Sequence, residues 1–486
     1  MNEKILSAAI LEKITYPVDT KYSVDQLNEE VMEAAHNNPA KIIVLDDDPT
    51  GVQTVHGVSV YTSWEEESIR QGFSEENKCF YILTNSRALT GEESRKQHQD
   101  IVARIQKVSR DKGIPFILIS RSDSTLRGHY PLETQVLKEG METESKQVDG
   151  EILCFYFYEG GRYTIDDVHY VLQGEKLVPA ALTEFAKDKT FGYHSSNLKE
   201  YVEEKTEGAY QADSVISISL QELNACDVAS IRKKLDGINN FAKVVVNAVC
   251  PEHLKVFCLA LYQSIEDGKT FLFRSAAGLV KEIAAIDDIA LLKAEDMLVK
   301  KDKENSESKE REKVGLVLVG SYTKKTSIQL NELLKTNILP IPFRSSLVLN
   351  DADFETEISR VIEEMNKNLR AGKSTVVYTE REPLKVDSHD KEELLRKSVK
   401  IADALCQIAS SLDLRPDFIL AKGGITSSMI GTEALQCKRA TVLGQAYPGI
   451  PVWRLGPESK FPDMPYVIFP GNVGGPEALR KVYEKF

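Results

Sequence analysis

Three consecutive aspartates end a run of aliphatic residues in IIVLDDDPTGVQTVHG, residues 42–57. The run predicts a buried strand, so Asp46, Asp47 and Asp48 stand together at its carboxyl end. Like charges repel, and a buried carboxylate without a partner usually takes up a proton. Solvent, or a cation and a substrate, must therefore offset these charges, which makes this loop the first candidate site.

Side chains suited to binding an anion follow the next predicted strands, in TNSR, RSDSTLRGH and GGRYT. An arginine fork pairs with both oxygens of a carboxylate or phosphate, and serine and asparagine suit hydroxyls, so the set predicts a pocket for a small hydroxylated acid. For each arginine the alternative is an internal ion pair with the aspartates. The set comprises Asn85, Arg87, Arg121, Ser122, Asp123, Ser124, Thr125, Arg127 and Arg162.

Three glycine turns occur in the second half of the chain: GSYT at 320–323, GGIT at 423–426 and PGNVGG at 470–475. Glycine lets the backbone approach a ligand, and the first N–H groups of a helix are unsatisfied, so each turn could hold an anion. A single turn of this kind is more often only a tight corner. Three in one domain favour a polyanion, most economically the phosphates of a nucleotide, although neither a Walker P-loop nor a dinucleotide fingerprint is present.

The elements that must position these residues alternate as strand, loop and helix. Residues 24–37 predict a helix, 41–45 predict a short apolar strand, and the alternation in GVSVYT at 57–62 indicates a second strand. This rhythm predicts an α/β fold of two doubly wound domains with largely parallel sheets, in which ligands lie at the carboxyl ends of strands. Residues 300–313 are almost wholly charged or polar and indicate a linker. We expect an N-terminal helical extension at 1–40, a sugar-acid-binding domain at 41–290, a charged linker at 291–313 and a nucleotide-binding domain at 314–486.

Composition narrows the class of partner. The 486-residue chain has a formal net charge of −13, which disfavours nucleic acid and anionic membrane as main partners. No apolar run approaches the ~20 residues that span a bilayer, and the N-terminus lacks the features of a secretory signal. The seven cysteines are scattered without a C-x-x-C pair, which argues against disulfides and a zinc site. We expect a cytoplasmic protein.

Two of these stretches resemble a known family. DDPTG at 47–51 and SDSTLRG at 122–128 are similar to the D-D-x-T-G and D-S-T-L-R-G motifs of the four-carbon acid sugar kinases, the two-domain DUF1537-type kinases. The resemblance extends from about residue 41 through TNSR, GGRYT, GSYT, GGIT, GQAYPGIP and PGNVGG. It implies an ATP-dependent enzyme that phosphorylates a hydroxyl of an acid such as threonate, erythronate or 3-oxo-tetronate, in a cleft between its domains.

The resemblance also implies roles for residues. Asp47 and Asp48 would accept the hydroxyl proton or help to hold Mg²⁺, whose ligands remain unassigned, and Asp123 is a further candidate base. The substrate would contact the arginine set, with Thr50 and Gly51 shaping the loop. ATP would contact Ser321, Gly423, Gly424, Thr426, Gly444, Gly471, Asn472 and Gly474. A homodimer is expected because many sugar kinases form one.

The chain departs from the family pattern at three places. Arg121 stands where lysine is usual, TEFAKDKTFGYHSSNL at 183–198 replaces a loop of the H-D-P type, and FPGNVGG lacks a lysine found ahead of the glycine in many members. These departures fall mostly on the substrate side. Two alternatives stay open: a non-catalytic regulator that binds a sugar acid or nucleotide, and a metal-dependent lyase or hydrolase acting on a sugar acid.

Overall fold

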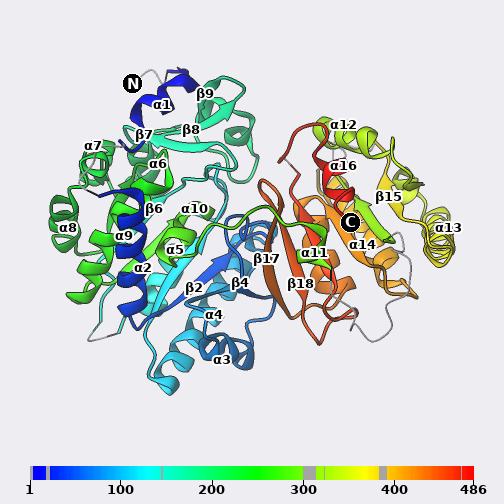
Figure 1. Cartoon of the computed structure of the whole chain (residues 1–486), viewed down its shortest axis with the longest axis horizontal. Coiled ribbons are helices and arrows are strands. Elements are labelled where there is room, and N and C mark those ends of the chain that lie inside the picture. The colour runs from blue at the N-terminus through cyan, green and yellow to red at the C-terminus, as the bar shows by residue number, and fades with distance from the viewer. Residues whose placement is uncertain are drawn as a thin grey trace. The chain divides into compact units, whose positions relative to one another are not determined.

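The chain folds into two compact units, shown in a computed structural model (Figure 1). The structure describes residues 4–17, 22–143, 146–298, 313–321, 323–381, 391–471 and 473–486. Unit 1 comprises Met1–Val55 and Ser63–Asp288, and unit 2 comprises His56–Thr62 and Ile289–Phe486. The segment His56–Thr62 therefore belongs with the second unit although it lies in the first part of the chain, which the sequence analysis did not anticipate.

Unit 1 is built on a parallel sheet of seven strands in the order β10-β11-β6-β12-β5-β2-β4. The strands are β2 (Lys41–Asp46), β4 (Cys79–Leu83), β5 (Phe116–Arg121), β6 (Gly150–Cys154), β10 (Ile216–Ile218), β11 (Ala242–Val246) and β12 (Phe271–Ser275). The chain passes from β2 to β4 on one side of β2 and then crosses to β5 on the other side, so the direction of winding reverses between β2 and β5. Such a switch point is where open α/β sheets bind ligands.

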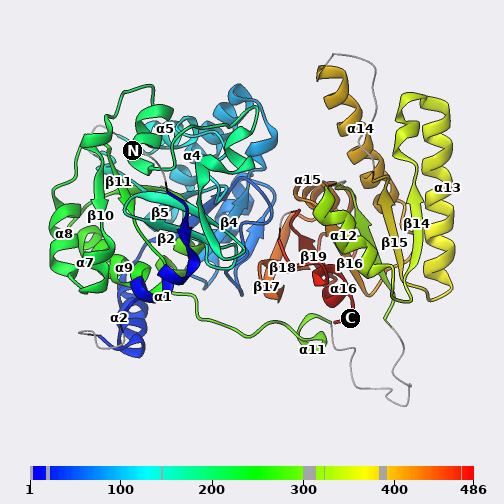
Figure 2. The same cartoon turned by 90° about the horizontal axis from the view of Figure 1, so that it is seen from above.

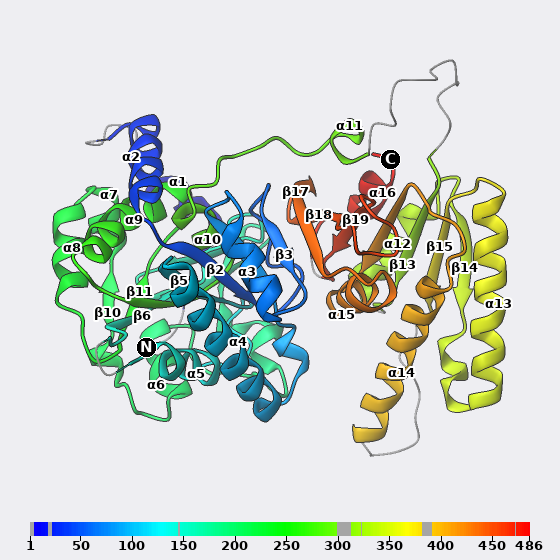
Figure 3. The same cartoon turned by 90° about the horizontal axis from the view of Figure 1, so that it is seen from below.

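Helices cover both faces of this sheet (Figure 3). They are α2 (Val24–Asn37), α3 (Glu66–Ser74), α4 (Gly91–Lys112), α5 (Leu132–Met141), α6 (Leu198–Lys205), α7 (Leu220–Asn224), α8 (Val228–Asp236), α9 (Pro251–Glu266) and α10 (Ala277–Ile283). The predicted helix at 24–37 is confirmed as α2. It begins with a capping box at Ser23 and packs along α9 (Figure 1).

A small antiparallel sheet lies beside the large one in unit 1, in the order β1-β9-β8-β7. Its strands are β1 (Leu6–Ser7), β7 (Arg162–Ile165), β8 (Val168–Gln173) and β9 (Lys176–Pro179). The alternation of strands, loops and helices predicted largely parallel sheets and gave no sign of this antiparallel one. This sheet carries a predicted site residue, because β7 begins with Arg162. Residues 180–187 continue from β9 as two short 3-10 turns.

Unit 2 has a mixed sheet in the order β3-β17-β18-β19-β16-β13-β15-β14. Its parallel strands are β13 (Gly315–Val319), β14 (Leu339–Phe343), β15 (Thr375–Thr379), β16 (Phe418–Lys422) and β19 (Pro465–Phe469), and β3 (Ser59–Tyr61), β17 (Arg439–Tyr447) and β18 (Ile450–Leu455) are antiparallel. The chain leaves β13 toward β14 but leaves β16 toward β19. A second switch point therefore lies between β13 and β16.

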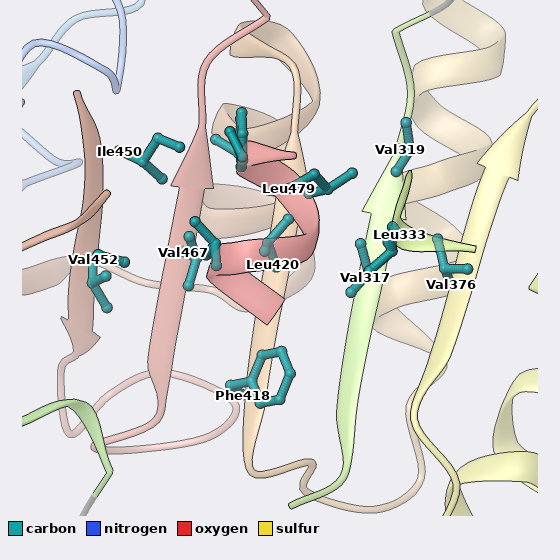
Figure 4. Close-up of a cluster of buried hydrophobic side chains, with 14 of the residues drawn as sticks. Val317, Val319, Leu333, Val376, Phe418, Leu420, Ile450, Val452, Val467 and Leu479 are labelled. Atoms are coloured by element: carbon teal, nitrogen blue, oxygen red, sulfur yellow. The ribbon is translucent and has the colours of Figure 1, made fainter. Parts of the chain in front are cut away.

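The core of unit 2 is a layer of aliphatic side chains between this sheet and its helices (Figure 4). Val317, Leu420 and Val467 come from adjacent strands and are fully buried against Leu333 of α12 (Lys324–Leu333) and Leu479 of α16 (Ala478–Tyr483). The other helices are α13 (Asp351–Arg370), α14 (Lys391–Ser410) and α15 (Gly424–Met429), and α13 runs along β14 (Figure 2). This packing fixes the strand ends that carry the glycine turns.

Two further findings hold for the described part of the chain. None of its helices combines the length and apolarity needed to cross a membrane. All seven cysteines fall within it, and each is buried with a free thiol.

Candidate functional site

The three aspartates lie at the switch point of unit 1. Asp46 ends β2, Arg121 ends the neighbouring β5, and the two residues are register partners in the sheet. Arg121 Nη1 lies 2.8 Å from Asp46 Oδ1, and both side chains are buried. Burial raises the pKa of Asp46 to about 7 even beside Arg121. This pair matches the internal ion pair that the sequence analysis left open for Arg121.

Gly51 is required by close approach to Asp46. A Cβ atom placed on Gly51 would lie 2.1 Å from Asp46 Oδ2, well inside contact distance. The loop after β2 therefore folds back over the Asp46 carboxylate and covers it. This contact explains why glycine follows Thr50 in DDPTG, and it agrees with the predicted role of Gly51 in shaping the loop.

Asp47 and Asp48 share Arg87, which follows β4. Arg87 Nη2 lies 2.7 Å from Asp48 Oδ2 and 3.4 Å from Asp47 Oδ1. Ser122 Oγ donates to Asp47 Oδ2 at 2.5 Å, and the N–H and hydroxyl of Thr50 donate to Asp48 Oδ1 at 2.8 and 2.5 Å. The Asp48 side chain is 19% exposed, against 3% for Asp47, so Asp48 is the carboxylate that a ligand can reach more readily.

The pKa values of Asp47 and Asp48 are shifted in opposite directions. Burial raises the pKa of Asp47 because the nearby arginines do not fully offset it. Burial alone would also raise the pKa of Asp48, but Arg87 and the Thr50 hydrogen bonds outweigh it and lower the pKa below its ordinary value. Asp48 is therefore fully ionised at neutral pH. Adjacent carboxyls with divergent pKa values are a common property of catalytic sites.

Asp123 lies just beyond the carboxyl end of β5 and pairs with Arg127 of its own loop and with Arg87 of the loop after β4. Arg127 Nε donates to Asp123 Oδ2 at 2.7 Å, the Thr125 hydroxyl donates to the same oxygen, and Arg87 Nη1 lies 3.5 Å from Oδ1. Burial opposes ionisation, but these cations and donors hold the pKa of Asp123 well below its ordinary value. Arg87 therefore links all three predicted catalytic aspartates.

Arg162 differs from the other arginines predicted for the acid pocket because it forms no ion pair among the described residues. Its side chain is buried, its Nη1 donates to the Gly160 carbonyl, and its Nε has no hydrogen-bond partner. Burial lowers the pKa of this guanidinium. Arg162 and Arg127 both lie over the Phe185 ring, at 5.7 and 5.1 Å from its centroid. An uncompensated buried guanidinium is costly, so an anionic ligand would stabilise it.

The remaining residues predicted for the acid pocket lie in the loops that follow β4 and β5. Asn85 has the left-handed backbone conformation, with φ of 52°. The Ser124 carbonyl lies 2.8 Å from Nε2 of the buried His169. Ser122 also lies within hydrogen-bond distance of Arg274, a residue outside the predicted set.

Arg274 and Glu133 also belong to this site, although neither was among the predicted residues. Arg274 Nη1 donates to Glu133 Oε2 at 2.5 Å, and its Nη2 donates to Ser122 Oγ at 2.8 Å, so a buried chain of contacts runs from Glu133 through Arg274 and Ser122 to Asp47. Burial alone would raise the pKa of Glu133, but Arg274, His98 and Ser86 outweigh burial and lower this pKa to about 2. The signal that could have revealed this pair is an arginine inside the apolar strand FLFRS.

In unit 2 the first two glycine turns pack against each other at the switch point. A Cβ atom on Gly320 would lie 2.3 Å from Thr426 Oγ1, and Gly423 has φ of 122°, which other residues rarely adopt. Gly424 then begins α15, and Ser321 Oγ accepts a hydrogen bond from Thr326 Oγ1 at 3.2 Å. The turns thus bring together the backbone and hydroxyl groups predicted to bind phosphate.

The third turn is anchored from α12. Gln329 Nε2 lies 3.1, 3.3 and 3.0 Å from the carbonyls of Val473, Gly474 and Gly475. Gly471 has open space where a side chain would be, whereas Gly474 has φ of 80°. Asn472, a predicted nucleotide contact, lies outside the described residues. Gly444 is in β17, where a Cβ atom would meet Ile289 at 2.7 Å, so this chain's own side chain fills that position.

Fold and site together define a protein of two α/β domains, each with a polar site at the switch point of its sheet. Comparison with known families agrees with this division. Residues 42–283 match the model of a sugar-binding N-terminal domain, and residues 316–479 match that of a nucleotide-binding C-terminal domain. No curated protein sequence matches the chain.

Solved structures share the fold. A Salmonella typhimurium LT2 protein superposes with a TM-score of 0.63 at 15% identity, covering 92% of this chain and 99% of the other. A Haemophilus influenzae DUF1537 protein gives 0.59 at 16% identity, covering 91% and 99%. A Bordetella bronchiseptica DUF1537 protein, a domain-swapped dimer with bound citrate, gives 0.39 at 17% identity, covering 91% and 98%. The first two similarities establish a common fold.

The two consecutive family models cover most of the chain in the order expected for this architecture. The chain belongs to the two-domain DUF1537-type family of four-carbon acid sugar kinases. The resemblance found in DDPTG and SDSTLRG is thereby confirmed.

Proposed function

We propose that the protein is an ATP-dependent kinase that phosphorylates a hydroxyl group of a small sugar acid, of the threonate, erythronate or 3-oxo-tetronate type. The observation that carries the proposal is the charged cluster at the switch point of unit 1, where three acids and their arginines stand beside the unpaired Arg162. Unit 2 supports it through its match to a nucleotide-binding domain. In this proposal unit 1 binds the acid and unit 2 binds ATP.

Arg162 would bind the substrate carboxylate. It is buried and forms no ion pair among the described residues. Its guanidinium is planar and carries a delocalised positive charge. A carboxylate can accept two parallel hydrogen bonds from such a fork, which gives both affinity and orientation. Arg127, already paired with Asp123, would add positive charge beside it. Phe185 packs under both guanidiniums and holds their planes.

Asp48 would receive the substrate hydroxyl. It is the most exposed of the three acids and is ionised, and Arg87 and Thr50 fix its orientation. Phosphoryl transfer demands mainly alignment, charge neutralisation and acceptance of one proton, which a positioned carboxylate can supply. Asp47 and Asp123 would orient Arg87, which would in turn offset the negative charge that grows on the transferred group.

Mg²⁺ would enter with ATP as part of the substrate. Magnesium sites in such enzymes are completed largely by phosphate oxygens and water, with only one or two protein carboxylates. The part of the chain that the structure describes contains no group of three or more histidine, cysteine, aspartate or glutamate residues able to hold a metal ion.

The test is ADP release from MgATP with a panel of sugar acids, including threonate, erythronate, 3-oxo-tetronates and longer isomers, with a no-acceptor control. Turnover with one acid would establish the kinase and identify its substrate. ATP binding without turnover on any acid would contradict the kinase and favour a regulator. Conversion of an acid without ATP would favour a lyase or hydrolase.

A further inference from the structure

Lys422 is a buried lysine at the switch point of unit 2. It is the last residue of β16, directly before the Gly423 turn, and its side chain is 0% exposed. Lysine is almost never fully buried unless it is paired, because removing an ammonium group from water is costly. Its position therefore requires an explanation.

The contacts of Lys422 offset this cost only in part. Its Nζ donates to the Pro470 carbonyl at 3.0 Å and lies 4.1 Å from the centroid of the Phe469 ring. An ammonium group has three donors, and these contacts supply one carbonyl and one aromatic face. Among the described residues Lys422 forms no ion pair. The other buried lysine of comparable depth, Lys243, pairs with Glu151 at 2.5 Å.

The neighbours of Lys422 belong to two of the glycine turns. Lys422 and Phe469 are register partners in β16 and β19, so the ammonium lies under the point where both strands end. Pro470 opens the third turn, and Gly423 opens the second. Lys422 thus joins the backbones of two turns through one hydrogen bond and places a positive charge behind both.

We propose that Lys422 is a positioning residue of the nucleotide site, which fixes the Gly423 and Pro470 turns and attracts the nucleotide phosphates through its charge. This inference rests on the proposed nucleotide site of unit 2. Because Lys422 is covered, it acts through the turns and its electric field and does not itself contact the phosphates. A polyanion in front of the turns would supply the negative charge that the protein does not.

The electrostatics of the unliganded protein agree with this role. Burial, and after it the charge of Lys325 on α12, lowers the pKa of Lys422 to about 7. Among the residues that the structure describes, Lys325 is the one charged group that shifts this pKa, and it has the same sign. A nearby polyphosphate would favour the protonated form, so binding of the ligand and charging of the lysine would reinforce each other.

The test compares ATP, ADP and adenosine binding to wild type and to two neutral variants. Lys422→Met keeps the apolar stem, and Lys422→Gln also keeps a donor for Pro470. We expect ATP affinity to fall roughly 10- to 100-fold in both variants. The loss should be smaller for ADP and absent for adenosine, because only the phosphates interact with the charge. Lys422→Arg should recover part of the ATP affinity.

The matched control is Lys335→Met, which removes an exposed lysine paired with Glu332 in the same unit and should leave every affinity unchanged. Equal loss for ATP and adenosine would overturn the inference and show a structural role only. ATP binding to Lys422→Gln at wild-type strength would also overturn it, since the charge would then be unnecessary. Failure of wild type to bind any nucleotide would instead refute the proposed function.

Discussion

The two switch points of this protein carry different kinds of polar groups. In unit 1, Asp46, Asp47 and Asp48 meet arginines from neighbouring loops and are largely neutralised before any ligand arrives. In unit 2, glycines and hydroxyls dominate, and Lys422 is a buried charge without an acidic partner in the described part of the chain. A small acid with several hydroxyls needs preset charges to orient it, whereas a nucleotide brings its own charges and needs donors and space.

The sharpest way to break this comparison is Asp48→Asn. We expect turnover to fall by about a thousandfold, since the amide cannot accept the hydroxyl proton, while ATP affinity stays within a few-fold. ADP release measures the first quantity and calorimetric titration with ATP the second. If ATP affinity collapsed as well, acid chemistry and nucleotide binding would not be divided between the units as proposed.

Arg162→Met tests whether unit 1 alone recognises the acid. Removing the unpaired guanidinium should raise KM for the acid about 100-fold and leave ATP affinity unchanged, and Arg162→Lys should restore little because it lacks the fork. Steady-state kinetics with varied acid provides the measurement. Arg70→Met, which removes an arginine paired with Glu66 and Asp111 at the surface, is the control. An unchanged KM would exclude Arg162 as the carboxylate contact.

Gly51→Ala tests how tightly the first site is packed. The added methyl group would meet Asp46 at 2.1 Å, so the loop must shift and the free energy of unfolding should fall by about 2 kcal/mol. Urea denaturation measures the change. Gly91→Ala, whose Cβ would lie at an ordinary 3.6 Å from Leu132, should cost little. Equal stability of both variants would show that Asp46 can move aside.

The smallest expected effect concerns the free energy of unfolding at acid pH. It tests a buried titratable group of unit 1, His169, that lies outside the aspartate cluster. Burial lowers the pKa of His169 from 6.5 to about 4. The unfolded chain therefore binds a proton that the folded chain does not, so stability present above pH 6.5 is lost as the pH falls toward 4. At about pH 5.5 the loss should be about 1.4 kcal/mol.

His169→Gln should reduce the difference between urea denaturation at about pH 7.5 and at about pH 5.5 by that amount. His253, whose pKa burial also lowers to about 4, should account for a similar share in its own variant. If the pH dependence of His169→Gln equalled that of wild type, His169 would have to take up its proton in the folded wild-type protein without a loss of stability.

Several elements could be predicted because their signals are local. The helix at 24–37 follows from its spacing of Leu27, Val31 and Ala35, and the strand ending at Asp46 follows from its aliphatic run. DDPTG and SDSTLRG revealed the family, which the domain models confirm. In contrast, a strand was predicted in GVSVYT and is observed at Ser59–Tyr61, but its pairing with Arg439–Thr441, which lies far away in the sequence, could not be predicted.

The sequence by itself determined the alternation of strands and helices, the glycine turns and the charged loops, since each depends on neighbouring residues. Tertiary structure alone decided which charges meet: Arg121 with Asp46, Arg274 with Glu133, and Lys422 with a carbonyl in place of a carboxylate. The physical reason is that strand order, which is set by packing over long sequence separations, determines the neighbours of each strand end. Only that order distinguishes an arginine that is already neutralised, such as Arg121, from one, such as Arg162, that forms no ion pair among the described residues.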